Sequence, residues 1–158
     1  FQKGFTFVEL MVIVVIVGLV ASLISIYIRP LDQMKKSRDN KRLSDTSLLD
    51  RVINEYLLDN KIYPDQVDIL RKSNVLPSGS LDFSNSNPGW IYENLSKYTE
   101  RLPIDPLNDD IYFYSYIHNE TGYEINVKLE YLTDEMAKDG GNSDDFYEIG
   151  NNLNLISP

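Results

Sequence analysis

The sequence contains no cysteine, and only one histidine, among its 158 residues. Without cysteine the chain can form neither a disulfide nor a thiolate metal site, and it lacks the nucleophile of a thiol enzyme. It also has no Gly-x-Ser-x-Gly elbow and no phosphate-binding glycine loop. The single histidine, His118, adjoins an expected hairpin tip, where polar surface residues are ordinary. We therefore expect a protein that is not an enzyme and requires no cofactor.

Basic residues are also in short supply, with 15 Lys and Arg against 24 Asp and Glu and a formal net charge of −9. An acidic balance of this kind favours solubility and argues against direct binding of nucleic acid. The main basic cluster, Lys35–Arg42, is short and is interrupted by Asp39. It could contact the phosphates of lipid headgroups or of DNA. We favour a solvated helical surface that meets the acidic heads of neighbouring copies.

Charge is absent altogether from the nineteen residues Leu10–Ile28. As a helix this run would span about 28 Å, close to the thickness of a hydrocarbon core, which predicts a membrane helix. A buried core helix rarely stays apolar for five turns, and Ala21-Ser22 is a poor site for secretory cleavage. Charges near the run do not fix its orientation. Lys3 is the one basic residue before the run in this sequence, whereas several Lys and Arg residues follow it. The positive-inside rule alone would therefore leave the C-terminal domain in the cytoplasm.

The residues in front of the apolar run form a recognisable signal. Lys3-Gly4-Phe5-Thr6-Phe7-Val8-Glu9 followed by an apolar helix resembles the class III signal of type IV pilins and pseudopilins. The resemblance implies that a prepilin peptidase cuts between Gly4 and Phe5 and that the new N-terminal Phe5 is methylated. Glu9 would then be the fifth residue of the mature chain. The outline of the whole chain is also similar to that of this family.

Glu9 is the one charge that enters the apolar segment. A carboxylate in hydrocarbon costs several kcal/mol unless it finds a partner. Cutting before Phe5 creates an α-amino group one helical turn from Glu9. In parallel, staggered copies the amine of one could neutralise Glu9 of the next, which would fix the axial register. The alternative is that Glu9 only sits in the first helical turn, where a negative charge suits the helix dipole.

Small residues in the apolar run indicate where helices could pack together in lipid. Gly18 falls where the family often has a glycine, and we expect it to act in assembly. Many family members have a proline at the place of Ile26, and the helix melts locally near that proline in assembled pili. In this chain such melting should be absent or shifted towards Gly18, Ser22 and Ser25. Ala21 completes the expected packing seam.

Beyond the membrane run the apolar spacing stays helical and then changes to period two. The inner stripe of an amphipathic helix is formed by Leu48, Leu49, Val52, Ile53, Tyr56 and Leu57. This predicts one long helix over residues 5–59 with a bend at Pro30. Short helices are expected at Gln66–Ser73 and Ile91–Glu100, the second contributing Ile91, Leu95, Tyr98 and Leu102 to a core with Trp90. Strands are expected at Ile111–Ile117, Tyr123–Leu129, Phe146–Ile149 and Leu153–Ile156.

These elements predict an α+β pilin fold, in which the long N-terminal helix packs on a small antiparallel sheet. Residues 1–4 would be the remnant of a leader. Residues 5–30 would be the transmembrane and filament-core helix, and residues 31–158 the globular head with the amphipathic half of the helix.

Two further kinds of site are suggested by short motifs. The acidic loop offers oxygen ligands suited to Ca²⁺ at Asp139, Asn142, Asp144 and Asp145, although their spacing does not match an EF-hand loop and a solvated acidic turn is the simpler explanation. A second acidic turn, Asp105–Asp110, could add ligands. Asn94 and Asn119 begin N-glycosylation triplets, and Asn119, at the expected hairpin tip, is the better acceptor.

The sequence therefore predicts a structural subunit of a type IV pilus-like filament, inserted in the cytoplasmic membrane and then assembled into an extracellular surface filament. Its expected partners are copies of itself, the prepilin peptidase, the inner-membrane pilus assembly machinery and the membrane. The nearer alternative is a pseudopilin of a type II secretion or DNA-uptake machine. The more distant one is a single-pass anchored binding domain that never polymerises.

Overall fold

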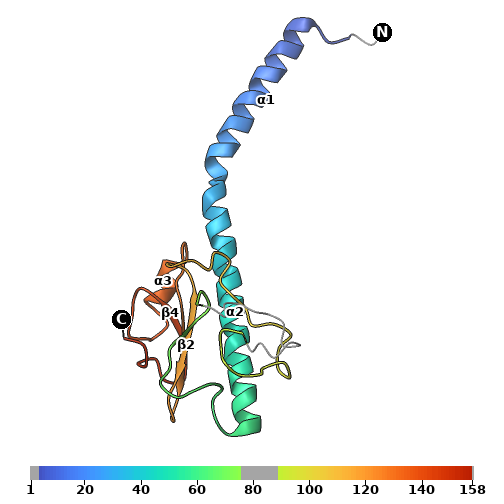
Figure 1. Cartoon of the computed structure of the whole chain (residues 1–158). Coiled ribbons are helices and arrows are strands. Elements are labelled where there is room, and N and C mark those ends of the chain that lie inside the picture. Colours follow the sequence, from blue (N-terminus) through green and yellow to red (C-terminus); the bar gives the residue numbers. More distant parts are fainter. Residues whose placement is uncertain (1–3, 76–88, 158) are drawn as a thin grey trace. The chain divides into compact units, whose positions relative to one another are not determined.

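A computed structural model describes residues 4–75 and 89–157, with the backbone alone for residues 25–28 (Figure 1). The chain divides into two compact units, Phe1–Lys35 and Lys36–Pro158. Each unit is described by itself.

The first unit is built on helix α1, Phe7–Ile28, which ends where the sequence meets a proline. Arg29 leaves the helical region and adopts a left-handed conformation with φ 44° and ψ 72°. The ring of Pro30 disfavours helical backbone at the residue before it, while Pro30 itself is well suited to begin a helix. Helix α2, Pro30–Asn60, starts there. The predicted single helix is therefore two helices, and the break lies at the expected position.

The second unit combines most of α2 with a four-stranded antiparallel sheet in the order β1-β2-β3-β4. The strands are β1 Arg71–Lys72, β2 Tyr114–His118, β3 Tyr123–Val127 and β4 Tyr147–Gly150. Strands β2 and β3 form the predicted hairpin, and Tyr116 pairs with Ile125 across it. A short helix, α3 Thr133–Met136, lies between β3 and β4.

The hydrophobic core lies between α2 and one face of the sheet (Figure 1). Alternate residues of β2 and β3 point to this face, because successive side chains of a strand point to opposite sides. The core side chains from the helix and these strands are Leu49, Val52, Ile53, Tyr56, Tyr114, Tyr116, Tyr123, Ile125 and Val127. The predicted α+β pilin-like fold is confirmed.

Two predicted short helices are not formed. Residues 66–73 lie along β2 and end in β1, and Asp65 and Asp68 have positive φ angles of 77° and 62° that exclude a helix there. Residues 91–100 form bends and turns, in which the Asn94 side chain accepts a hydrogen bond from Ser96 N at 3.1 Å. The apolar residues of this segment are nevertheless buried, including Trp90, Ile91, Leu95 and Leu102.

The predicted last strand, Leu153–Ile156, is also absent. The backbone N–H groups of Leu155 and Ile156 donate to the carboxylate of Glu124, at 2.6 and 3.0 Å, rather than to a neighbouring strand. The C-terminal segment is thus held to β3 by a buried side chain.

Candidate functional site

The N-terminal end of α1 is closed by a reciprocal capping box between Thr6 and Glu9. Thr6 stands in extended backbone, and its Oγ1 accepts a hydrogen bond from Glu9 N at 3.2 Å. The Glu9 carboxylate in turn accepts from Thr6 N and from Thr6 Oγ1, both at 2.8 Å. This satisfies backbone N–H groups that the first helical turn leaves without partners.

The capping box shows how Glu9 is held before any neighbour arrives. Both donors belong to Thr6, so a cut between Gly4 and Phe5 would leave them in place. Neutral donors orient a carboxylate without cancelling its charge, and Glu9 can therefore still attract an ammonium group. Thr6 was not among the residues predicted from the sequence. The Thr-x-x-Glu pattern ahead of an apolar run was the signal that could have identified it.

The predicted cleavage point lies outside the helix. Gly4 and Phe5 precede the first helical residue, and the Phe5 side chain is 78% exposed. A peptide bond outside a helix is open to a peptidase, whereas a bond within α1 could be bound only after the helix unwinds. The roles of Gly4 and Phe5 in cleavage and methylation remain predictions.

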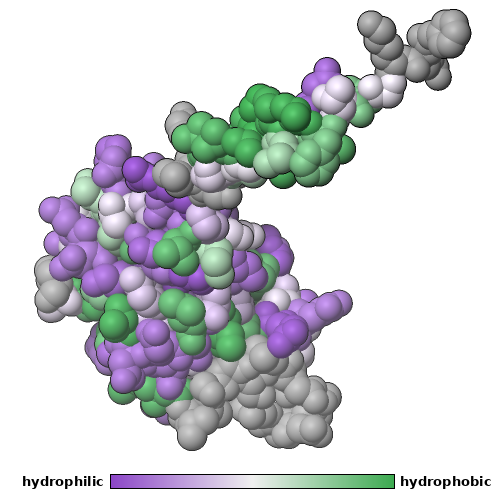
Figure 2. All heavy atoms as spheres, turned by 90° about the horizontal axis from the view of Figure 1, so that it is seen from above, coloured by the Kyte–Doolittle hydropathy of each residue, from purple (hydrophilic) through white to green (hydrophobic). Residues whose placement is uncertain are grey.

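Over Phe7–Ile24, helix α1 has an apolar surface that no described part of the chain covers. Residues Phe7–Ile24 are long and apolar enough to span a membrane, and none of this segment is buried inside the chain. Figure 2 shows hydrophobic side chains gathered along this helix. Exposing that much apolar surface to water is unfavourable, so lipid or the helices of other copies must cover it.

The small residues of α1 leave its surface open to close approach. A Cβ atom added to Gly18 would meet no atom within 4 Å, so a neighbouring backbone can approach there. The Ser22 hydroxyl donates to Leu19 O at 2.8 Å within the same helix. The backbone is helical from Phe7 to Ile28, and the expected shift of melting towards Gly18, Ser22 and Ser25 is not seen in this structure.

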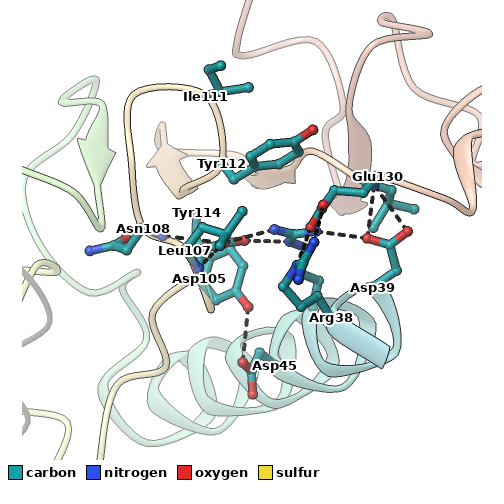
Figure 3. A network of polar contacts seen from close by, with 12 residues as sticks. Arg38, Asp39, Asp45, Asp105, Leu107, Asn108, Ile111, Tyr112, Tyr114 and Glu130 are labelled. Carbon is teal, nitrogen blue, oxygen red and sulfur yellow. Dashed lines mark hydrogen bonds and ion pairs between the residues drawn. The ribbon is translucent and has the colours of Figure 1, made fainter. Parts of the chain in front are cut away.

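The head contains a buried charge network that includes Asp39, Asp105 and Glu130 (Figure 3). Its central residue is Arg42 of α2. Arg42 is fully buried and contacts three carboxylates, those of Asp39, Asp105 and Glu130. Its guanidinium binds Asp105 through two hydrogen bonds of 2.6 and 3.0 Å, and Glu130 through one of 2.6 Å. It also lies 4.6 Å from the centre of the Tyr112 ring. Arg42 thus ties α2 to two segments that are distant in the sequence.

The other members of the network hold the turn that follows β3. The Asp39 carboxylate accepts hydrogen bonds from the backbone N–H groups of Glu130, Tyr131 and Leu132, at 2.6 to 3.1 Å. Arg38 forms a bidentate pair with Glu130. The Arg38 and Arg42 guanidinium groups lower the pKa of Glu130 to about 2.

The prediction of a solvated surface at Lys35–Arg42 is therefore wrong for part of the cluster. Arg42 and Asp39 are fully buried, and Arg38 is occupied by Glu130. Asp105, expected as an additional calcium ligand, instead binds Arg42.

Of the four residues predicted to bind calcium, two make other hydrogen bonds and two are exposed. Both Asp139 oxygens accept backbone hydrogen bonds, one from Gly141 N at 2.9 Å and the other from Glu148 N at 2.7 Å. Asn142 donates to Ile156 O at 3.1 Å, and Asp144 and Asp145 are exposed. Within residues 4–75 and 89–157, no three His, Cys, Asp or Glu side chains gather as metal ligands.

Asn119, the predicted glycosylation site, stabilises the hairpin tip. Its side-chain oxygen accepts hydrogen bonds from Thr121 N and Thr121 Oγ1, both at 2.9 Å, and from Gly122 N at 2.8 Å. This turn gives Asn119 a structural role, and its modification remains a prediction.

An uncovered apolar helix, a capped acidic residue at its start and an α+β head together define a pilin-type subunit. The family model described as "Prokaryotic N-terminal methylation motif" matches residues 1–25. A type II secretion system core protein G of Pseudomonas aeruginosa is 32% identical over 152 residues, covering 95% of this chain and 94% of that protein. The chain belongs to the pilin and pseudopilin family.

Other relatives carry the same name. The type II secretion system core protein G of Escherichia coli is 31% identical over 112 residues, which cover 69% of each chain. That of Vibrio cholerae is 32% identical over 114 residues, covering 72% of this chain and 71% of the relative. No solved structure matches the chain significantly.

Proposed function

We propose that this chain is a pseudopilin of a type II secretion machine rather than the major subunit of a surface pilus. The supporting observation is the similarity to a type II secretion system core protein G over 95% of this chain and 94% of the relative. A match of that extent includes the head as well as the signal, and the signal alone is common to both kinds of subunit.

The proposed role is mechanical and not catalytic. The uncovered α1 first resides in the cytoplasmic membrane, and cutting before Phe5 supplies the amine that Glu9 of the next copy requires. Copies then bundle through their apolar helices, with Gly18 on the packing surface and the heads on the outside. Such a contact between unlike surfaces repeats without closing, which produces a filament. The prepilin peptidase and an inner-membrane assembly machine would be the necessary partners.

Deleting this chain from its host should stop the export of a set of proteins. We expect their abundance in the culture medium to fall at least about tenfold, measured by quantitative mass spectrometry, and to recover with the wild-type chain. A cytoplasmic marker protein controls for lysis, and electron microscopy counts surface fibres. Unchanged export together with a loss of fibres would instead identify the major pilin. Unchanged export with intact fibres would favour an anchored domain that does not polymerise.

A further inference from the structure

The residues that follow α1 in the sequence carry exposed cations. Residues 29–36, which we call the neck, consist of Arg29 and the first two turns of α2. Lys35 and Lys36 are exposed, and the Arg29 side chain is 78% exposed. Asp32 is the one acidic residue among these three basic residues, so the neck has a net charge of +2 in a chain whose formal net charge is −9.

The cations of the neck are those that the head leaves unpaired. Further along α2, Arg38, Lys41 and Arg42 each bind a carboxylate of the head. Within residues 4–75 and 89–157, no ion pair includes Lys35 or Lys36. Arg29 meets Asp32 at 3.9 Å, and such an exposed, long contact holds a charge only weakly. The neck is therefore free to bind an anion.

The length of α1 determines which anion is near. Its 22 residues are about 33 Å long, which is enough to cross a hydrocarbon core of about 30 Å. Lys35 and Lys36 lie within about 9 Å of the start of α2 along the helix. The polar layer on each side of the core is about 5 to 8 Å thick, and long basic side chains extend their charges towards it. When α1 is inserted, the cations of the neck are thus within reach of lipid phosphates.

Two exposed apolar side chains accompany these cations. Leu31 is 72% exposed and Met34 is 57% exposed. Lys35 follows Leu31 by four residues, so the two side chains are neighbours on the helix surface. A membrane interface accepts both kinds of side chain, because acyl chains cover the apolar groups while phosphates pair with the cations. Lipid is also available to a single inserted chain, whereas the acidic heads of neighbouring copies become available only on assembly.

We propose that Arg29, Lys35 and Lys36 bind the phosphates of anionic lipids while the chain is an inserted monomer. Each cation near an anionic membrane surface adds to the attraction, and lysine binds phosphate as a point charge. These contacts hold the start of α2 at the membrane surface and are given up when the chain leaves lipid for a filament. The proposal rests on membrane insertion of α1 and is independent of the secretion role.

The test is lipid binding by the full chain in detergent, followed by native mass spectrometry during titration with phosphatidylglycerol or with zwitterionic phosphatidylcholine. Wild-type protein should bind phosphatidylglycerol at least about fivefold more tightly than phosphatidylcholine. Replacing both neck lysines, Lys35→Gln with Lys36→Gln, should reduce this preference to less than about twofold. The matched control, Lys97→Gln with Lys138→Gln, removes the same charge from side chains of the head that are 70% and 68% exposed. It should keep the wild-type preference.

Three results would overturn the proposal. Equal binding of the two lipids by the wild-type protein would show that the neck does not recognise anionic lipid. An equal loss of preference in the control variant would show that net charge alone is responsible. A preference that survives in the Lys35→Gln, Lys36→Gln variant would place the lipid elsewhere, and failed assembly of that variant would then assign both lysines to the acidic heads of neighbouring copies. The fluorescence of Trp90, in the core of the head, verifies that each variant is folded.

Discussion

Replacing Glu9 with valine is expected to abolish filament assembly while leaving membrane insertion and the folded head intact. The change removes the only charge from the helix start and leaves the amine of an adjoining copy buried without a partner. Breaking a buried pair in this way costs about 3 to 5 kcal/mol, which lowers an association constant at least about a hundredfold. Membrane insertion should persist because valine lengthens the apolar run.

The measurement is the amount of polymer in sheared or crosslinked material, compared with the amount of membrane-bound monomer. Glu55→Val is the matched control, because Glu55 is partly exposed on α2 and pairs with Arg51 on the same helix. That variant should assemble normally. Wild-type levels of polymer from the Glu9→Val chain would mean that Glu9 does not set the register.

Replacing Arg42 with glutamine is expected to destabilise the head by about 3 to 5 kcal/mol, because it leaves buried carboxylates without their cation. Asp105 loses both of its hydrogen bonds to the guanidinium, and Glu130 keeps only Arg38. Chemical denaturation followed by Trp90 fluorescence measures the loss. The stability of Arg42→Lys should lie between those of the wild type and Arg42→Gln, because lysine keeps the positive charge but lacks the planar guanidinium.

The control for this experiment lies on the same helix. Arg51 pairs with Glu55 at the surface, and its side chain is 51% exposed. Arg51→Gln should therefore change stability by no more than about 0.5 kcal/mol. An equally small effect of Arg42→Gln would show that the buried network does not hold the head together.

The sequence predicted those features that follow from local patterns. The apolar run predicted the exposed helix α1, and Pro30 marked the place where the helix would break. The change to period two predicted the β2–β3 hairpin. The helical spacing of Ile91, Leu95 and Leu102 misled us, because an irregular segment can bury the same side chains.

The charge network could not be predicted because its partners are distant in the sequence. Arg42 looked like one basic residue of a surface cluster, yet Asp105 and Glu130 lie 63 and 88 residues further on. Thr6 was different. Its capping pattern is local, so the sequence alone would have been sufficient to identify Thr6, although we did not predict it.

The most direct test of this interpretation is the intact mass and N-terminal sequence of the chain recovered from assembled filaments. Cleavage after Gly4 should leave N-methylphenylalanine at position 5 as the first residue, with its amine free to meet Glu9 of the neighbouring copy. A polymer whose subunits still carry residues 1–4 would contradict the account, because the nitrogen of Phe5 would then be an uncharged peptide amide.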